Sequence, residues 1–209
     1  MTRCEPLSPD LVEVEREHEH LGKLPTVKII AAAGPITVES IEDASARKSD
    51  ALVALSGTYE WSLKVHASGL GIGLFDVRQL FGALNDADIA KYDHNSVAYF
   101  VKRTAAHKQV KRLDRVDEFD FIVHRDNLKP LRIFVADEYM LSEAFVLDVL
   151  EVHPEVDVIA NLSSWNSYTL QAAHRAEELG AKVLDLSGLT AALYRDKEWI
   201  LAYAPKVGH

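Results

Sequence analysis

The sequence has little cysteine: Cys4 is the only one among 209 residues, so no internal disulfide can form. A chain without disulfides suits a reducing compartment, and we expect a cytoplasmic protein. Cys4 also lies in a polar N-terminal stretch, which offers no structured setting for an activated nucleophile.

Long apolar runs are also missing. None approaches the roughly 20 residues that a membrane-spanning helix needs, and the opening "MTRCEPLSPDLVEVEREHEHLG" is too polar and acidic for a secretory signal. We therefore expect no membrane partner. His18 and His20 in this stretch are two residues apart, so on a helix they would diverge and belong to a solvated face rather than a metal site.

Several motifs of catalysis are absent. The chain has no phosphate-binding loop of either common type, and "GLGIGLF" at 69–75 precedes a predicted strand rather than following one. There is no Gly-x-Ser-x-Gly sequence for a hydrolase nucleophile. These absences remove the most readily recognised nucleotide-binding and esterase classes.

The chain does contain an ordinary globular balance, with 48% apolar and 26% charged residues, and it is long enough for one large or two small domains. Strand and helix patterns alternate after residue 25, which predicts an α/β protein with largely parallel sheets. We expect a charged leader at 1–24 with a short helix in 8–22, a first α/β unit at 25–85 and a second at 86–209. The predicted strands are 26–34, 50–57, 71–76, 118–124, 131–139, 157–164, 182–186 and 198–205, and the predicted helices are 37–48, 59–68, 77–84, 96–113, 141–152, 166–180 and 187–195.

Two stretches repeat one pattern. "DALVALSG" at 50–57 and "DVIANLSS" at 157–164 are followed by further matches in register, which favours an internal duplication over the general likeness of α/β units. Ligands of parallel sheets bind beyond the carboxyl ends of strands. The loops there would offer Ser56, Thr58, Ser163, Ser164, Trp165 and Asn166 to a small ligand. Alternatively, the first serine of each loop caps the next helix.

The charge is unevenly distributed. The chain carries −9, but residues 102–115 carry +5 and leave −14 for the rest. This basic strip contains Lys102, Arg103, Lys108, Lys111, Arg112 and Arg115. Within a helix at 96–113 most of these cations share one face, which would contact the phosphates of nucleic acid. The alternative is a solvated helix, or one that pairs with acids of the other unit.

The segment "DEFDFIVHRDNLKPLRIFVADEY" at 117–139 predicts a hairpin that brings Asp120 together with Asp137 or Glu138. Two such carboxylates, Asp120 and Asp137 above all, would hold Mg²⁺, which stabilises phosphoryl charge and activates water. Alternatively, these acids are solvated strand ends.

This hairpin resembles the PD-(D/E)XK nuclease superfamily, and "VDVIANLSSWNSYTLQAAHRAEELGAKVLDLSGLTAAL" is similar to the tail of Mrr-type restriction endonuclease domains. The resemblance covers about 96–195 and implies Mg²⁺-dependent phosphodiester hydrolysis with Asp120, Asp137 and Glu138 as catalytic residues. The family's lysine after the acid is missing in "ADEYM", where Lys129 or Arg132 would have to replace it. The resemblance therefore implies a degenerate, nuclease-like second unit.

Our main hypothesis is a nucleic-acid-associated protein with DNA or RNA as partner, a pseudo-enzyme if Mg²⁺ does not bind. Two alternatives stay open: a Rossmann-like sensor of a small nucleotide, and a non-catalytic structural or assembly subunit with a protein partner or a second copy of itself.

Overall fold

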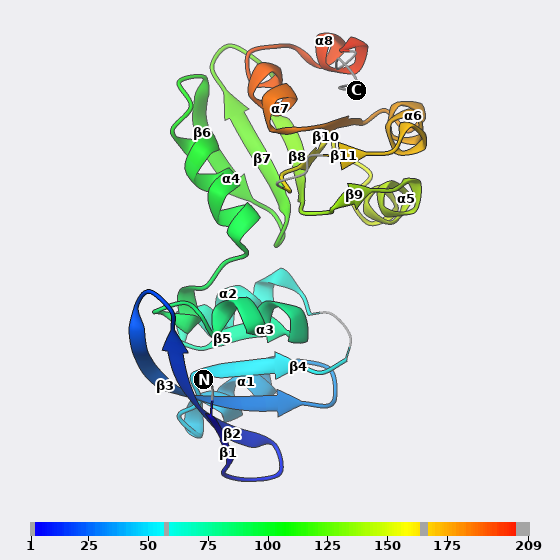
Figure 1. The fold of residues 1–209 in the computed structure, drawn as a ribbon. Helices are drawn as coiled ribbons and strands as arrows, with labels where there is room; N and C mark the ends of the chain where they lie inside the picture. The colour runs from blue at the N-terminus through cyan, green and yellow to red at the C-terminus, as the bar shows by residue number, and fades with distance from the viewer. Residues whose placement is uncertain (1–2, 57–58, 164–166, 204–209) are drawn as a thin grey trace. The chain divides into compact units, whose positions relative to one another are not determined.

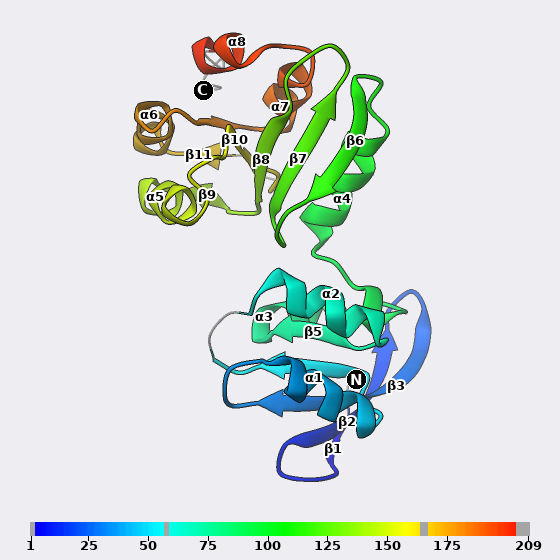
Figure 2. The same cartoon turned by 180° about the vertical axis from the view of Figure 1, so that it is seen from behind.

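The computed structural model describes residues 3–56, 59–163 and 167–203, and the chain divides into two compact units, Met1–His94 and Asn95–His209 (Figures 1 and 2). Residues 86–94 therefore belong with the first unit, where the sequence predicted a boundary after residue 85. Each unit has its own sheet and its own hydrophobic core.

Unit 1 contains one five-stranded sheet in the order β1-β2-β3-β4-β5. The first three strands form an antiparallel meander, and β3, β4 and β5 are parallel. The elements are β1 (Arg3–Pro6), β2 (Leu11–His18), β3 (Gly22–Ala32), α1 (Val38–Ala46), β4 (Ala51–Ala54), α2 (Trp61–Gly69), β5 (Gly73–Asp76), α3 (Val77–Ala83) and a short 3-10 helix, η1 (Ile89–Lys91).

The N-terminal segment is not helical, so the predicted helix at 8–22 is wrong. In β2 the sequence "LVEVEREH" alternates apolar and charged residues, the period of a strand with one buried face. Val14 is 4% exposed and packs in the core, whereas Glu15 and Glu17 on the other side of the strand are exposed. Residues 3–18 thus extend the first sheet rather than forming a separate leader.

The helices of unit 1 cover both faces of the sheet. Residues of α1 and α2 pack with Ile30, Leu52 and Leu74 on one face. Residues of α3 pack with Ile29 and Phe75 on the other. The result is a three-layer α/β/α unit.

Unit 2 contains a second five-stranded sheet in the order β12-β10-β8-β7-β6 and a two-stranded sheet of β9 and β11. In the larger sheet β6, β7 and β8 are antiparallel, and β8, β10 and β12 are parallel. The elements are α4 (Asn95–Ala105), β6 (Val110–Arg115), β7 (Asp120–Arg125), β8 (Leu131–Ala136), β9 (Met140–Leu141), α5 (Glu143–Val152), β10 (Val158–Asn161), β11 (Ser167–Tyr168), α6 (Leu170–Glu178), β12 (Lys182–Leu184), α7 (Leu186–Ala192) and α8 (Lys197–Ala202).

The helices of unit 2 also form two layers (Figures 1 and 2). The helices α4 and α7 pack with Phe121 and Ile133 on one face of the sheet. The helices α5 and α6 pack with Phe134 and Ile159 on the other. Because Ile133 and Phe134 are neighbours on β8, they point to opposite faces, as a strand requires.

Three predictions for the second half need correction. The predicted helix at 96–113 ends at Ala105, and Val110–Arg115 forms strand β6. The predicted closing strand at 198–205 is helix α8, which begins after the side chain of Asp196 caps it. The sheets are mixed rather than largely parallel, because each begins with an antiparallel meander.

The two units share one topology, since strand order and strand directions match throughout the five-stranded sheets. The aspartates that begin the two repeated stretches, Asp50 and Asp157, make equivalent hydrogen bonds in the two units. Asp50 Oδ2 lies 2.7 Å from the backbone N of Lys28, and Asp157 Oδ2 lies 2.9 Å from the backbone N of Arg132. Each carboxylate thus accepts a hydrogen bond from the first parallel strand of its sheet, at the end opposite the carboxyl ends of the parallel strands.

Candidate functional site

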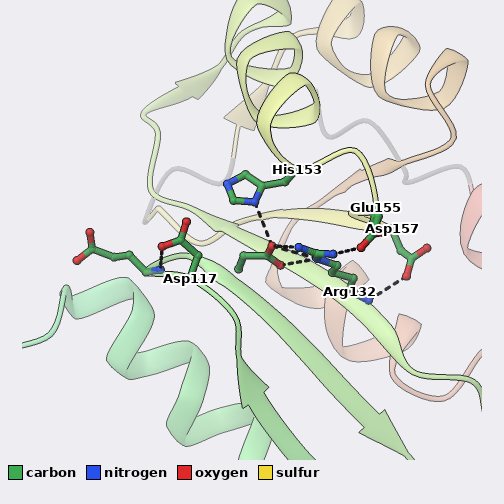
Figure 3. A network of polar contacts seen from close by, with 7 residues as sticks. Asp117, Arg132, His153, Glu155 and Asp157 are labelled. Atoms are coloured by element: carbon green, nitrogen blue, oxygen red, sulfur yellow. Dashed lines mark hydrogen bonds and ion pairs between the residues drawn. The ribbon is translucent and has the colours of Figure 1, made fainter. Parts of the chain in front are cut away.

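The predicted metal ligand Asp120 lies at the start of β7, and its side chain is 0% exposed. Its carboxylate faces Arg132 on β8, whose Nε lies 3.1 Å from Oδ1 and whose Nη2 lies 2.7 Å from Oδ2. The ring Nδ1 of His153, after α5, lies 3.1 Å from Oδ2 (Figure 3). The buried charge is therefore neutralised by an arginine and bonded to a histidine.

Arg132 is itself held on three sides (Figure 3). Its Nη1 donates to Glu155, and its backbone N donates to the carboxylate of Asp157. The hydrogen bond to Asp120 raises the pKa of the Arg132 guanidinium. The arginine thus supplies a permanent positive charge where a metal ion would have to sit. Lys129, the other suggested substitute for the missing lysine, lies in the loop between β7 and β8.

Asp137 and Glu138 follow the end of β8 and are exposed. Glu138 is fixed through its backbone: its N–H donates to the Asn161 side chain at 3.1 Å, and its carbonyl accepts from the same amide at 2.9 Å. Asn161 is fully buried at the end of β10. The exposed pair and the buried Asp120 therefore lie in different environments.

Among residues 3–56, 59–163 and 167–203, no group of three or more His, Cys, Asp and Glu side chains could hold a metal ion. The Mg²⁺ site with Asp120 and Asp137 stays a prediction from sequence. What the structure does give Asp120 is a complete set of protein partners.

The six cations of the basic strip do not form one helical face. Lys102 and Arg103 lie in the last turn of α4, and Lys108 lies in the turn that follows. The others lie on β6. The correction follows from the break in the helix at residues 106–109, where the chain turns back into the sheet.

The three cations on β6 already have partners. Lys111 pairs with Asp126 at 2.6 Å, and Arg112 pairs with Asp114 at 2.8 Å. Arg115 donates to the carbonyl of Glu118 at 2.6 Å. The charges of Lys111 and Arg112 are thus offset by nearby carboxylates, and Arg115 stabilises the backbone after β6.

The other three cations remain without an ion pair in the part of the chain that the structure describes. All of Lys102, Arg103 and Lys108 are exposed. Arg103 lies over the ring of Tyr99 at 5.8 Å, and Lys108 lies over the ring of Tyr194 at 5.5 Å. We call Lys102, Arg103, His107, Lys108 and Tyr194 the basic-aromatic surface.

Sequence reasoning missed the aromatic half of this surface. Tyr194 follows α7 and contacts the ring of His107, with 4.7 Å between ring centres. The next aromatic, Trp199 of α8, lies under Arg195 at 5.3 Å. The string "LYRDKEW" carried the signal, because aromatic and basic residues alternate there, but the prediction of a strand at 198–205 obscured it.

The predicted ligand loops are described in part. Thr58, Ser164, Trp165 and Asn166 lie outside the described residues. Ser56 donates to the carbonyl of Ala33 at 3.3 Å, and Ser163 is buried. Neither serine caps the next helix, because the N-cap residues are Glu60 for α2 and Thr169 for α6.

These features define an α/β protein of two topologically matched units with mixed sheets. No protein-family model matches the chain, and no curated protein matches it either. Within the described residues, none of the helices is both long and apolar enough to cross a bilayer.

Proposed function

We propose that this chain associates with nucleic acid through unit 2 and does not cut it. The observation that carries the proposal is that Lys102, Arg103 and Lys108 are exposed within seven consecutive residues and make no ion pair among the described residues. Lys108 also lies over the ring of Tyr194. Cations free to meet phosphates release counterions on binding, which drives association with polyanions.

The state of Asp120 supports the second half of the proposal. The nuclease resemblance would require the carboxylate of Asp120 to be ionised and accessible to a divalent ion. In the structure its oxygens already contact Arg132 and His153. Replacing these partners with Mg²⁺ would leave the half-buried guanidinium of Arg132 beside a second cation, which is unfavourable. A degenerate nuclease-like unit that binds without cleaving fits both features.

We also propose that the two units are copies of one module. Support comes from their common strand order and from the matched bonds of Asp50 and Asp157. In unit 2 the helix α4 precedes the first strand of the sheet, whereas among residues 3–56 and 59–94 of unit 1 no helix precedes β1. The basic-aromatic surface includes residues of α4 and lies in unit 2.

Charge-matched double variants test the binding. Lys102→Ala with Lys108→Ala should weaken binding of a labelled DNA or RNA strand, as measured by fluorescence anisotropy. The negative slope of log K against log salt should become shallower by about 2, since each lost phosphate contact changes it by about 1. Lys111→Ala with Arg112→Ala removes the same charge from the same strip but from cations already paired with acids. It should change the slope little.

The proposal fails if the unmodified protein binds no strand at low salt, or if both double variants weaken binding equally. Cleavage is tested separately with Mg²⁺ or Mn²⁺: degradation of the strand that is lost in Asp120→Asn would restore the catalytic interpretation.

A further inference from the structure

Beside the basic-aromatic surface lies a pocket of about 230 Å³ between α4 and α7. Its floor is apolar, made by Phe100, Leu189 and Leu193, which are each 1–3% exposed. The floor residues belong to the core of unit 2, so the shape of the pocket is set by the packing of α4 and α7 on the sheet.

The rim of this pocket is polar and basic. Arg103, His107 and Thr190 line it together. The Nδ1 atom of His107 accepts from the backbone N of Gln109 at 3.3 Å, so the neutral ring carries its proton on Nε2 as a donor. Burial, with a smaller effect of Lys108, lowers the pKa of His107 and favours this neutral form at neutral pH.

A second hollow of about 540 Å³ lies at the end of α7, lined by Ala191, Tyr194, Arg195 and Trp199. It too combines an aromatic ring with an arginine, because Arg195 lies over Trp199. The helix α7 and its C-terminal residues contribute to both hollows. Two apolar hollows along α7, each with an arginine in its lining, offer contacts for both parts of a nucleic-acid strand, its bases and its phosphates.

We propose that these two hollows receive unstacked bases of a single-stranded nucleic acid, while Arg103 and Lys108 contact its phosphates. The inference rests on the proposed function and narrows its ligand. Bases in a duplex are paired and stacked, so they cannot enter a hollow without being flipped out. Single strands offer their bases freely, and stacking on protein rings stabilises such complexes with little sequence preference.

Three labelled ligands of equal length test this: a thymidine homopolymer, the same backbone without bases, and a duplex. We expect the base-bearing strand to bind up to about a hundredfold more tightly than the abasic strand, because two bases are held and each stacked base contributes about tenfold. The duplex should also bind more weakly than the base-bearing strand at the same salt concentration.

A pocket-filling variant separates stacking from charge. Thr190→Phe places a ring into the first hollow without changing any charge. It should remove most of the preference for the base-bearing strand while the salt slope stays the same. Ser187→Phe, on the same helix but outside the lining, is the matched control and should keep the preference. Thermal unfolding checks that both variants fold.

The outcomes are distinct. Equal binding of the base-bearing and abasic strands, or tighter binding of the duplex, overturns the single-strand inference while leaving nucleic-acid association intact. Loss of the preference in Ser187→Phe as well as Thr190→Phe also overturns it. Failure of every ligand to bind at low salt removes the proposed function itself.

Discussion

Arg16 and Arg125 hold the same position in the two units: each is buried and reaches from the second strand of its sheet to the end of a later helix. Arg16 Nη1 lies 2.7 Å from the carbonyl oxygen of Asp86, beyond α3. Arg125 Nη1 lies 2.9 Å from the carbonyl oxygen of Ala192 in α7. Each Nε donates to a carbonyl of its own hairpin. Burial lowers the pKa of both guanidinium groups.

Replacing either arginine should therefore destabilise its unit. Arg125→Ala removes the hydrogen bonds that the partly buried carbonyls of Lys129 and Arg195 accept, together with one of those at the Ala192 carbonyl. We expect the free energy of unfolding to fall by about 3 kcal/mol. Arg125→Lys should recover little, because an ammonium group cannot span the same carbonyls. Urea unfolding followed by circular dichroism measures both changes. Arg78→Ala, an exposed arginine on α3, is the control and should be neutral.

Arg16→Ala should have an effect of the same size as Arg125→Ala, since the bonds are equivalent. A large difference between the two losses of unfolding free energy would contradict the proposal that the units are copies in which Arg16 and Arg125 make equivalent hydrogen bonds.

Loss of the buried carboxylate should also be costly. Asp120→Ala leaves the guanidinium of Arg132 with only the exposed Glu155 as an acidic partner among the pairs that Arg132 makes, and we expect a destabilisation of about 3 kcal/mol. The double variant Asp120→Ala with Arg132→Met should recover part of it, because no uncompensated charge remains. A thermodynamic cycle from denaturant unfolding tests this coupling. If Asp120→Ala unfolds at the same denaturant concentration as the wild type, Asp120 is not structural.

A surface carboxylate in unit 1 should govern part of the acid sensitivity. Asp10 receives two hydrogen bonds from Arg47, at 2.7 and 2.9 Å, which lower its pKa well below the ordinary value of 3.8. A lowered folded-state pKa stabilises the protein above about pH 4, and this contribution disappears as pH falls through the folded-state value.

Asp10→Asn should consequently lower Tm at neutral pH, with a difference from wild type that shrinks on acidification. Thermal scans across the acid range measure the effect. Glu42→Gln, an exposed neighbour on α1, should keep the wild-type profile. A constant difference at all pH values would contradict the assignment to Asp10 ionisation.

Two glycines provide a test of backbone strain. Gly71 and Gly180 follow the helices between the parallel strands of each unit, with φ of 77° and 80°. A Cβ would meet no atom within 4 Å at either position, so only the left-handed backbone is at issue. Gly180→Ala should cost about 1 kcal/mol in unfolding experiments. Gly34→Ala has equal space and no positive φ, and its stability should stay near that of wild type.

The parallel half of each unit could be predicted from sequence. Short apolar runs such as "ALVA" and "VIAN" are bounded by polar residues and followed by helical patterns, so the strand and helix assignments there agree with the structure. Burial of a strand on both faces leaves a clear pattern. The hairpin between β7 and β8 was also predicted, with Pro130 in its polar loop.

The antiparallel strands at the edge of each sheet were harder to predict, because their many charged residues obscure the two-residue alternation of a strand. "LVEVEREH" has acids on one face of a strand, which resembles the solvated side of a helix. In 102–115 the cations recur at helical spacings, and the apolar pair Val110 and Leu113 also has a helical spacing of three. Both nevertheless pack against the core from β6, because the register of this strand shifts between Val110 and Arg112. The short apolar run of α8 fits either structure by periodicity alone.

The chemistry of the candidate site depended on tertiary partners that no local pattern reveals. Asp120 was predicted from the sequence as a catalytic residue and Mg²⁺ ligand, whereas its contact with His153, 33 residues away at the end of α5, could not be predicted. The meeting of Lys108 with Tyr194 joins two ends of unit 2. Such contacts arise from the order of strands in the sheet, which sequence periodicity does not encode.

The buried arginines also set when each unit can be completed during synthesis. Arg16 bonds carbonyls 68 and 70 residues further along the chain, and Arg125 bonds carbonyls 67 and 70 residues further along. Each arginine can therefore complete its hydrogen bonds only after a late helix of its unit, α3 in unit 1 and α7 in unit 2, has left the ribosome. Since unit 1 ends before unit 2 begins, unit 1 can fold while unit 2 is still being translated, which limits the opportunity for strands of the two units to pair with each other.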